Sequence, residues 1–281
     1  MPYCLARQAD WHCNIVDKKA VTHIEGVIAR RKNQSQPFPL HKYVHHGLSS
    51  QAMLFNLIGP LAARDDLLPL VSVFERAGIP WPEGDVGATF EYEDRRVFTE
   101  KQVQPTSIDL VVGAPSRPGA LFIECKLVET GFGGCSVFAD GDCDGSNPAT
   151  DFDSCYLHHI GRTYLTALKE AGLFEGKLGK DTNCALVNHY QFFRELLLAV
   201  RKQGFFVLLG DERSPVFVND GGARQRGIWP HLLSVLPDDL QKRAAFVTVQ
   251  SVVEEIVATG RHPWIVEFRK KYGLMAEFPE I

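Results

Sequence analysis

Charged side chains interrupt two apolar, strand-like segments in the middle of the chain. Asp109 lies within residues 107–112, and Glu124 and Lys126 lie within residues 120–127. Alternate residues of a strand share a face, so Glu124 and Lys126 point to the same side. Burying such charges costs several kcal/mol unless they are paired or bind a metal. A divalent cation would satisfy all three residues.

The chemistry that fits this set is metal-dependent hydrolysis of a phosphodiester. Asp109 and Glu124 would supply hard oxygen ligands to Mg²⁺ or Mn²⁺, and Mg²⁺ keeps several waters and leaves room for a phosphate oxygen. Lys126 would orient or deprotonate the attacking water and stabilise charge on the phosphorus. Glu91, in the preceding strand-like segment 88–92, is the further carboxylate for a second ion or a water-mediated contact. The alternative is a surface hairpin with a cross-strand ion pair.

The spacing of these residues resembles the motif of the PD-(D/E)xK nuclease superfamily. Its members carry an acid at the end of one strand and then an acid, any residue and a lysine on the adjoining strand, as Asp109 and Glu124-Cys125-Lys126 do here. Ile108 replaces the proline of the name, at a position that varies widely among such enzymes. The segment 48–61 also looks like the N-terminal helix of one bacterial branch of uncharacterised members. The resemblance covers about residues 45–210, and it implies a restriction-endonuclease-like fold and a DNA substrate.

The resemblance also implies polar residues on the helix that follows the lysine strand. Gln191 and Arg194 are three residues apart and share a helical face, and Arg194 would hold the scissile phosphate or Glu91. Gln51 and Asn56, on a helix that Ser49 and Ser50 are suited to begin, would face the site or the DNA backbone. Solvent-facing polar residues are the alternative explanation for all four.

The seven cysteines are an odd number spread over a chain with no secretory segment, which favours reduced thiols or a metal site over a disulfide scaffold. Four follow the lysine strand and could together bind Zn²⁺ or an iron–sulfur cluster, as in some members of the superfamily: Cys135, Cys143, Cys155 and Cys184. None forms a C-x-x-C pair. We therefore interpret them as small buried hydrophobic residues and predict that the four do not all converge.

The acidic segment 140–151, which contains Cys143, resembles a calcium loop. Asp140, Asp142 and Asp144 alternate before a glycine, and Asp151 stands twelve positions into the loop. Pro148 and the final aspartate, where a glutamate is usual, depart from that pattern. An acidic, glycine-rich surface loop is the simpler interpretation.

The elements that must position these residues alternate between helix and strand. Apolar periodicity and breaker residues predict helices over 17–31, from 49 to the Gly59-Pro60 break, and over 66–77, 155–171 and 184–202. Strands are predicted over 88–92, 107–112 and 120–127 as a β-meander, and over 205–210 and 245–249. The expected fold is α/β, a restriction-endonuclease-like core with a mixed central sheet flanked by helices and with added N- and C-terminal helices. We predict a helical arm and connector over 1–40 and a nuclease-like domain with a C-terminal strand and helix extension over 41–281.

Composition is that of an ordinary globular protein: 281 residues, 45% hydrophobic and 23% charged, with a net charge of -4. The negative charge disfavours a protein that coats nucleic acid electrostatically, but it does not exclude a nuclease with a local basic face. No apolar run approaches the roughly 20 residues of a membrane helix, and we expect a cytoplasmic protein.

These observations favour a Mg²⁺- or Mn²⁺-dependent DNA endonuclease of restriction, defence or repair type. Cutting both strands needs two active sites in a homodimer, or two successive nicks by one site. The alternatives are a catalytically inactive nucleic-acid-binding or partner-binding module on the same fold, or a zinc-stabilised structural protein.

Overall fold

The computed structural model describes residues 4–100, 104–214 and 227–275. Its five strands form one sheet in the order β1-β2-β3-β4-β5. They are β1 (Ala88–Asp94), β2 (Thr106–Val112), β3 (Leu121–Lys126), β4 (Phe205–Gly210) and β5 (Ala244–Thr248). Strands β1 to β3 are antiparallel, whereas β3, β4 and β5 are parallel. The sheet is therefore mixed, and the predicted meander is confirmed.

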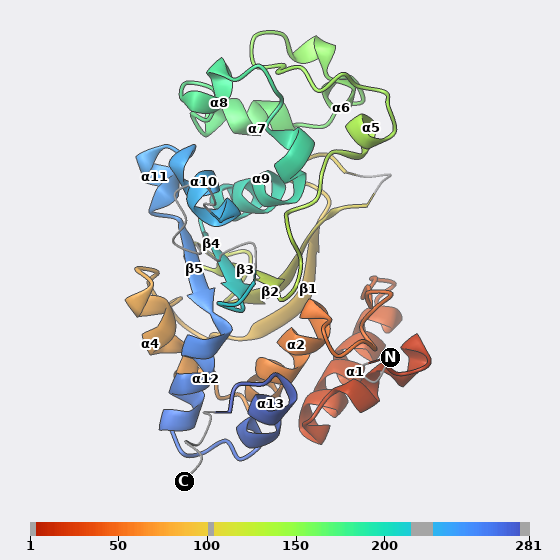
Figure 1. The fold of residues 1–281 in the computed structure, drawn as a ribbon, viewed down its shortest axis with the longest axis vertical. Coiled ribbons are helices and arrows are strands. Elements are labelled where there is room, and N and C mark those ends of the chain that lie inside the picture. The colour runs from red at the N-terminus through yellow and green to blue at the C-terminus, as the bar shows by residue number, and fades with distance from the viewer. Residues whose placement is uncertain (1–3, 101–103, 215–226, 276–281) are drawn as a thin grey trace.

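Helices precede, interrupt and follow the strands (Figure 1). Before the sheet come η1 (Gln8–Asn14), α1 (Lys18–Asn33), α2 (Ser50–Leu57), α3 (Gly59–Ala62) and α4 (Leu68–Arg76). Between β3 and β4 come α5 (Ser136–Ala139), η2 (Phe152–Ser154), α6 (Tyr156–His159), α7 (Tyr164–Glu170), α8 (Lys177–Lys180) and α9 (Leu186–Arg201). Helices α10 (Ile228–Ser234) and α11 (Asp238–Gln241) precede β5, and α12 (Val249–Ala258) and α13 (Ile265–Lys271) follow it.

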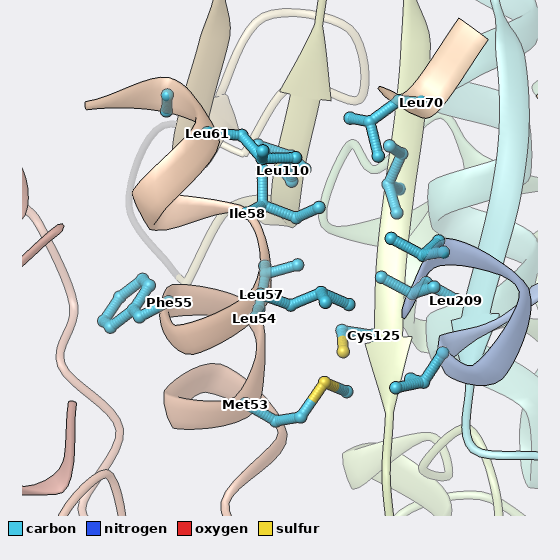
Figure 2. Packing of buried hydrophobic residues seen from close by; sticks show 14 of the residues in the cluster. Met53, Leu54, Phe55, Leu57, Ile58, Leu61, Leu70, Leu110, Cys125 and Leu209 are labelled. Carbon is cyan, nitrogen blue, oxygen red and sulfur yellow. The ribbon is translucent and has the colours of Figure 1, made fainter. Parts of the chain in front are cut away.

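Each face of the sheet is covered by its own hydrophobic core. One core packs α1, α2, α4, α12 and α13 against the sheet, and the other packs α7, α9 and α10 against the opposite face. Figure 2 shows the first core, where Met53, Leu54 and Leu57 of α2 point toward Cys125 and Leu209. Helices on both faces of a mixed sheet make this the predicted α/β, restriction-endonuclease-like architecture.

The caps of two helices agree with their sequence signals, whereas two other helices depart from theirs. The side chains of Asp17 and Ser49 accept hydrogen bonds from the first turns of α1 and α2. The single helix predicted over 155–171 is instead α6 and α7, separated at Gly161, whose φ of +83° ends α6. Helix α9 is kinked at His189, where φ is −134°.

Helix α1 shares the first core with the rest of the chain, because Ile24 of α1 and Leu54 of α2 are buried in the same cluster. The division of the chain at residue 40 stays a prediction. Among the described residues, no helix combines the length and the apolar character needed to cross a membrane.

Candidate active site

Three acidic residues occupy neighbouring positions on β1, β2 and β3. The β1–β2 pairing runs on both sides of Glu91 and places it opposite Asp109. The β2–β3 pairing joins Leu110 to Ile123, so that Asp109 comes next to Glu124. The three acids therefore form a row across the antiparallel half of the sheet.

The backbone of β1 is distorted at Glu91, which has a φ of +51°. Such a φ is unfavourable for a residue other than glycine. Phe90 packs in one core and Tyr92 against the other, although alternate strand residues normally share a face. The guanidinium of Arg31 donates hydrogen bonds to the carbonyls of Phe90 (2.6 Å) and Glu91 (2.7 Å). The amide of Gln51 on α2 donates to the Glu91 carboxyl at 2.6 Å. Polar groups from α1 and α2 thus hold the bend and orient Glu91.

Burial and mutual repulsion leave this row of acids short of positive charge. Burial, helped by repulsion from Glu124 and opposed by the Gln51 hydrogen bond, raises the pKa of Glu91 to about 8. Burial and repulsion from Glu124 and Glu91 also raise the pKa of Asp109 well above its usual range, although the backbone N–H of Cys125 donates to its carboxyl at 2.9 Å. Both acids are therefore held partly or wholly protonated at neutral pH, and a nearby cation would favour their ionisation.

The side chains of Glu124, Lys126 and Gln191 all contact one another. The ammonium of Lys126 lies 2.8 Å from Oε1 of Glu124, and Gln191 donates to the same oxygen at 2.6 Å. Lys126 also donates to Oε1 of Gln191 at 2.9 Å. Burial alone would lower the pKa of Lys126, but the charge of Glu124 and the hydrogen bond to it raise that pKa above its usual value. Lys126 is therefore a fixed positive charge in the metal-free protein.

Arg194 lies in a different cluster from Gln191. Its guanidinium donates to the carboxylate of Glu100 at 2.7 Å and to the hydroxyl of Thr106 at 3.0 Å, and it lies over the ring of Tyr190. The predicted contact between Arg194 and Glu91 is therefore not the one that forms, because the long arginine side chain pairs with the fully buried Glu100 instead.

Gln51 and Asn56, predicted on the same helix, also separate. Gln51 lines the cavity of the acidic row and contacts Glu91. Asn56 is fully buried and accepts a hydrogen bond from the backbone of Val16, while its amide donates to the carbonyl of Asn14. It therefore joins α2 to the N-terminal segment and does not face the site.

Glu195 is a buried acid beside the site that the sequence interpretation missed. One carboxyl oxygen has no hydrogen-bond partner in the structure, while Gln191 bonds the group. Burial, then repulsion from Glu124, raises its pKa well above the usual range. Its position four residues after Gln191, on the same face of α9, is the signal that would have identified it.

A single cavity of about 890 Å³ unites the predicted catalytic residues. Glu91, Asp109, Glu124, Lys126 and Gln191 all line it. A second cavity of about 880 Å³ adjoins it through three shared lining residues, Pro37, Glu93 and Arg95. The second cavity is rich in basic residues, namely Arg30, Arg31, Arg95, Arg96 and Lys202. The acidic site therefore opens next to a basic surface.

Residues 5–273 match the family model described as Restriction Endonuclease associating with ARP. The chain belongs to this family. No curated protein and no solved structure matches the chain. The family description supports a nuclease-like function for the fold and the site described above.

The acidic row of this restriction-endonuclease family member offers carboxylate oxygens to a metal ion. In the described ranges no three His, Cys, Asp or Glu side chains are arranged as ligands of one ion. Mg²⁺ does not require such a set, because one or two carboxylates suffice and waters and substrate phosphates complete its coordination. Adjacent hard oxygen donors that repel each other, as Asp109 and Glu124 do, fit this ion.

In the acidic loop that resembled a calcium site, two of the aspartates accept hydrogen bonds from the loop's own backbone. Asp144 accepts a hydrogen bond from the N–H of Ser146, and Asp151 accepts one from Asp153. These contacts are those of surface turns.

Proposed function

We propose that this protein is a Mg²⁺- or Mn²⁺-dependent deoxyribonuclease of the PD-(D/E)xK type. Asp109 and Glu124 would bind the metal, Glu91 would assist it, and Lys126 would act on the attacking water and the phosphorus. The observation that carries the proposal is a row of mutually repelling carboxylates beside a protonated lysine, all lining one cavity.

The metal, when bound, would polarise the scissile phosphate and acidify a water. The protein's own residues would hold the carboxyl groups in position for these two roles. The amide of Gln51 and the backbone N–H of Cys125 fix the carboxyls of Glu91 and Asp109 before any cation arrives. Such preorganisation avoids rearranging the site during the reaction.

The state of Lys126 favours an electrostatic role over that of a general base. The charges that raise its pKa keep the ammonium protonated, so it cannot take a proton from water. An ammonium fixed by Glu124 and Gln191 can orient a water and offset the negative charge that develops on phosphorus. The aromatic ring of Phe132, 5.6 Å from its nitrogen, limits the space around it.

The adjoining basic cavity supports a polyanionic substrate. Arg30, Arg31, Arg95, Arg96 and Lys202 line this cavity. Three of them already have partners in the protein: Arg31 bonds carbonyls of β1, Arg95 lies 3.7 Å from Glu93, and Lys202 pairs with Asp94 at 2.6 Å. Phosphate contacts position a nucleic acid without reading its sequence. DNA whose backbone runs along this surface would reach the acidic row through the boundary that both cavities share.

The test is cleavage of supercoiled and linear DNA, and of RNA, with Mg²⁺, Mn²⁺ or EDTA. We expect cleavage of DNA that EDTA abolishes. Asp109→Asn should lose both cleavage and metal binding measured by calorimetry, because it removes a ligand charge. Asp85→Asn makes the same change at an exposed position away from the cavity and should behave as the wild type.

Two outcomes would contradict the proposal. Binding of DNA without cleavage in any metal would indicate the inactive binding module. Equal cleavage by Asp109→Asn and the wild type would show that Asp109 takes no part in the reaction. Sedimentation with and without DNA would show whether two copies assemble to cut both strands.

A further inference from the structure

A loop at the edge of the acidic cavity exposes an aromatic side chain and a lysine. The loop comprises residues 39–48, and its Pro39 and His41 line the cavity together with the acidic row. Lys42 and Tyr43 are exposed, and 46% of Tyr43 is open to solvent. Aromatic side chains stabilise a fold chiefly by being buried, so packing does not account for this tyrosine. Its position beside the cavity indicates contact with a substrate.

Hydrogen bonds from the N-terminal segment hold the backbone of this loop in one shape. The amide of Gln8 donates to the carbonyls of residues 40 and 41, both at 3.1 Å. The amide of Asn14 donates to the carbonyls of residues 44 and 46, at 2.9 and 2.8 Å. Val44 is fully buried in the first core. The exposed side chains therefore project from a fixed backbone, which reduces the entropy that is lost when they bind a ligand.

The side chain of Gln51 joins the loop to the acidic row. Its oxygen accepts a hydrogen bond from the backbone N–H of His41 at 2.8 Å. Its amide group donates to the carbonyl of Pro39 at 2.9 Å and to the carboxyl of Glu91 at 2.6 Å. One side chain therefore fixes the loop relative to an acid of the candidate active site.

The ring of Tyr43 lies near two histidine rings and the ammonium of Lys42. Its centroid is 5.4 Å from that of His41 and 4.9 Å from that of His46, and the nitrogen of Lys42 lies 4.7 Å from it. Partial burial and the charge of Lys42 lower the pKa of His41, so this imidazole is uncharged at pH 7. The loop thus presents an aromatic surface and one cation on a flexible side chain.

We propose that residues 39–48 form a stacking platform for an unpaired base of the DNA substrate. The base would replace the ammonium of Lys42 over the ring of Tyr43, and the ammonium would move to an adjacent phosphate. Every base has a π-face that can stack on an aromatic ring, so the contact is independent of sequence. In a duplex these faces are covered by the neighbouring base pairs, so the platform selects a single-stranded or an extruded nucleotide.

The charge of the loop and its neighbours favour a nucleic acid over an apolar partner. Among the residues that the structure describes, no carboxylate pairs with Lys42, and a polyanion would supply the counter-charge that an apolar peptide lacks. Pro37, two residues before the loop, lines both the basic and the acidic cavity. A strand that runs from the basic cavity toward the acidic row would therefore run past the loop. That this polyanion is DNA rests on the proposed function.

The test is binding of the full chain to labelled DNA in EDTA, followed by fluorescence anisotropy. The probes are a single strand, a blunt duplex of the same sequence, and that duplex with one unpaired, bulged nucleotide. Tyr43→Ala should weaken binding of the single strand roughly tenfold, the value of about one stacked base, and binding of the blunt duplex by less than about twofold. An equal loss for the bulged duplex would identify an extruded nucleotide as a ligand too.

Two further variants serve as controls. Tyr43→Phe keeps the ring and should bind every probe as the wild type does. Tyr156→Ala removes another exposed tyrosine, on α6 and outside the lining of both cavities, and should change nothing. Because Tyr43 is exposed, its variants should keep the wild-type Tm within about 2 °C.

Three results would overturn the platform. They are a Tyr43→Ala variant that binds all three probes as tightly as the wild type, an equal loss for all three, which would make Tyr43 a general backbone contact, and a wild type that binds none. Since binding is measured without metal, the outcome is separate from that of the cleavage test. Binding through Tyr43 without cleavage in any metal would refute the nuclease and support the platform. Cleavage by a protein whose binding is indifferent to Tyr43 would do the reverse.

Discussion

Helix α9 contacts two groups of buried charges. The group around Glu100 has a partner for every charge, whereas the row of Glu91, Asp109 and Glu124 does not. Glu100 is fully buried, yet Arg194 pairs with it at 2.7 Å and the N–H and hydroxyl of Thr106 donate to it at 2.6 and 2.8 Å. The hydroxyl of Tyr164 donates to it too. Every charge in this cluster has a partner within the chain.

The acidic row of Glu91, Asp109 and Glu124 has fewer positive charges than acids. Asp109 and Glu124 share the ammonium of Lys126, Glu91 is near the guanidinium of Arg31, and Glu195 adds a fourth acid with an unbonded oxygen. Buried charges normally find partners, so a cluster that lacks them is suited to an external cation. The Glu100–Arg194 ion pair therefore serves to stabilise the fold, whereas the acidic row is suited to binding a cation.

The largest effect on stability is expected from Arg194→Met, which breaks the cluster around Glu100. It leaves Glu100 buried without a counter-charge, which typically costs about 3 to 5 kcal/mol, or a fall in Tm of roughly 10 °C or more. Thermal unfolding would measure it, and Mg²⁺ should give no rescue. Arg201, on α9 like Arg194, forms a more exposed pair with Glu170 of α7, and Arg201→Met should cost about 1 kcal/mol or less. Equal effects of the two variants would remove the distinction between the clusters.

Lys126→Met tests the acidic row and should mainly affect catalysis. Loss of a preorganised charge lowers cleavage by roughly 10² to 10³, or about 3 to 4 kcal/mol. The metal-free variant should also be less stable, because Glu124 loses its ion pair, but here Mg²⁺ should restore Tm. Mg²⁺ should bind at least as tightly as before, since a like charge has been removed. Cleavage at the wild-type rate would exclude the lysine from the reaction.

The strands, their order along the meander and the acids of the candidate site could be predicted from the sequence. Charged residues in apolar strands are rare, and alternation fixes which of them share a face. The positions of Asp109, Glu124 and Lys126 in one cavity follow from that pattern.

The outer contacts of the site could not be predicted, because helical spacing places residues on a face but does not choose their partners. Gln191 and Arg194 share a face, yet one reaches Glu124 and the other reaches Glu100. The bend at Glu91 depends on Arg31, sixty residues earlier.

A smaller effect is expected on the pH dependence of stability, through Glu91. Its pKa is about 8 in the folded protein and 4.5 in the absence of the fold. Its protonation therefore stabilises the fold fully below pH 4.5, and this stabilisation is lost as the pH rises through about 8. The Tm of metal-free protein should fall by roughly 5 to 10 °C over this interval, and Mg²⁺ should offset the fall most at high pH.

Glu91→Gln is the variant that isolates this effect. It cannot ionise, so its Tm in EDTA should fall less with pH than that of the wild type. Glu83→Gln, at an exposed position, should follow the wild type. A steeper pH dependence in Glu91→Gln would mean that other acids control the stability of the site.

The smallest effect is expected from Glu195→Gln. Burial and repulsion keep Glu195 protonated at neutral pH, so a neutral amide of the same shape should change Tm by no more than about 2 °C and cleavage by less than about threefold. As the pH rises above the usual range of a glutamate, the variant should gain stability relative to the wild type, because the unfolded wild type ionises Glu195 while the folded protein keeps it protonated. Glu195→Ala, which leaves a cavity at the same place, should be less stable at every pH. A tenfold or greater loss of cleavage in Glu195→Gln would show instead that Glu195 ionises once a metal neutralises Asp109 and Glu124. Glu195 would then take part in the reaction together with Asp109 and Glu124.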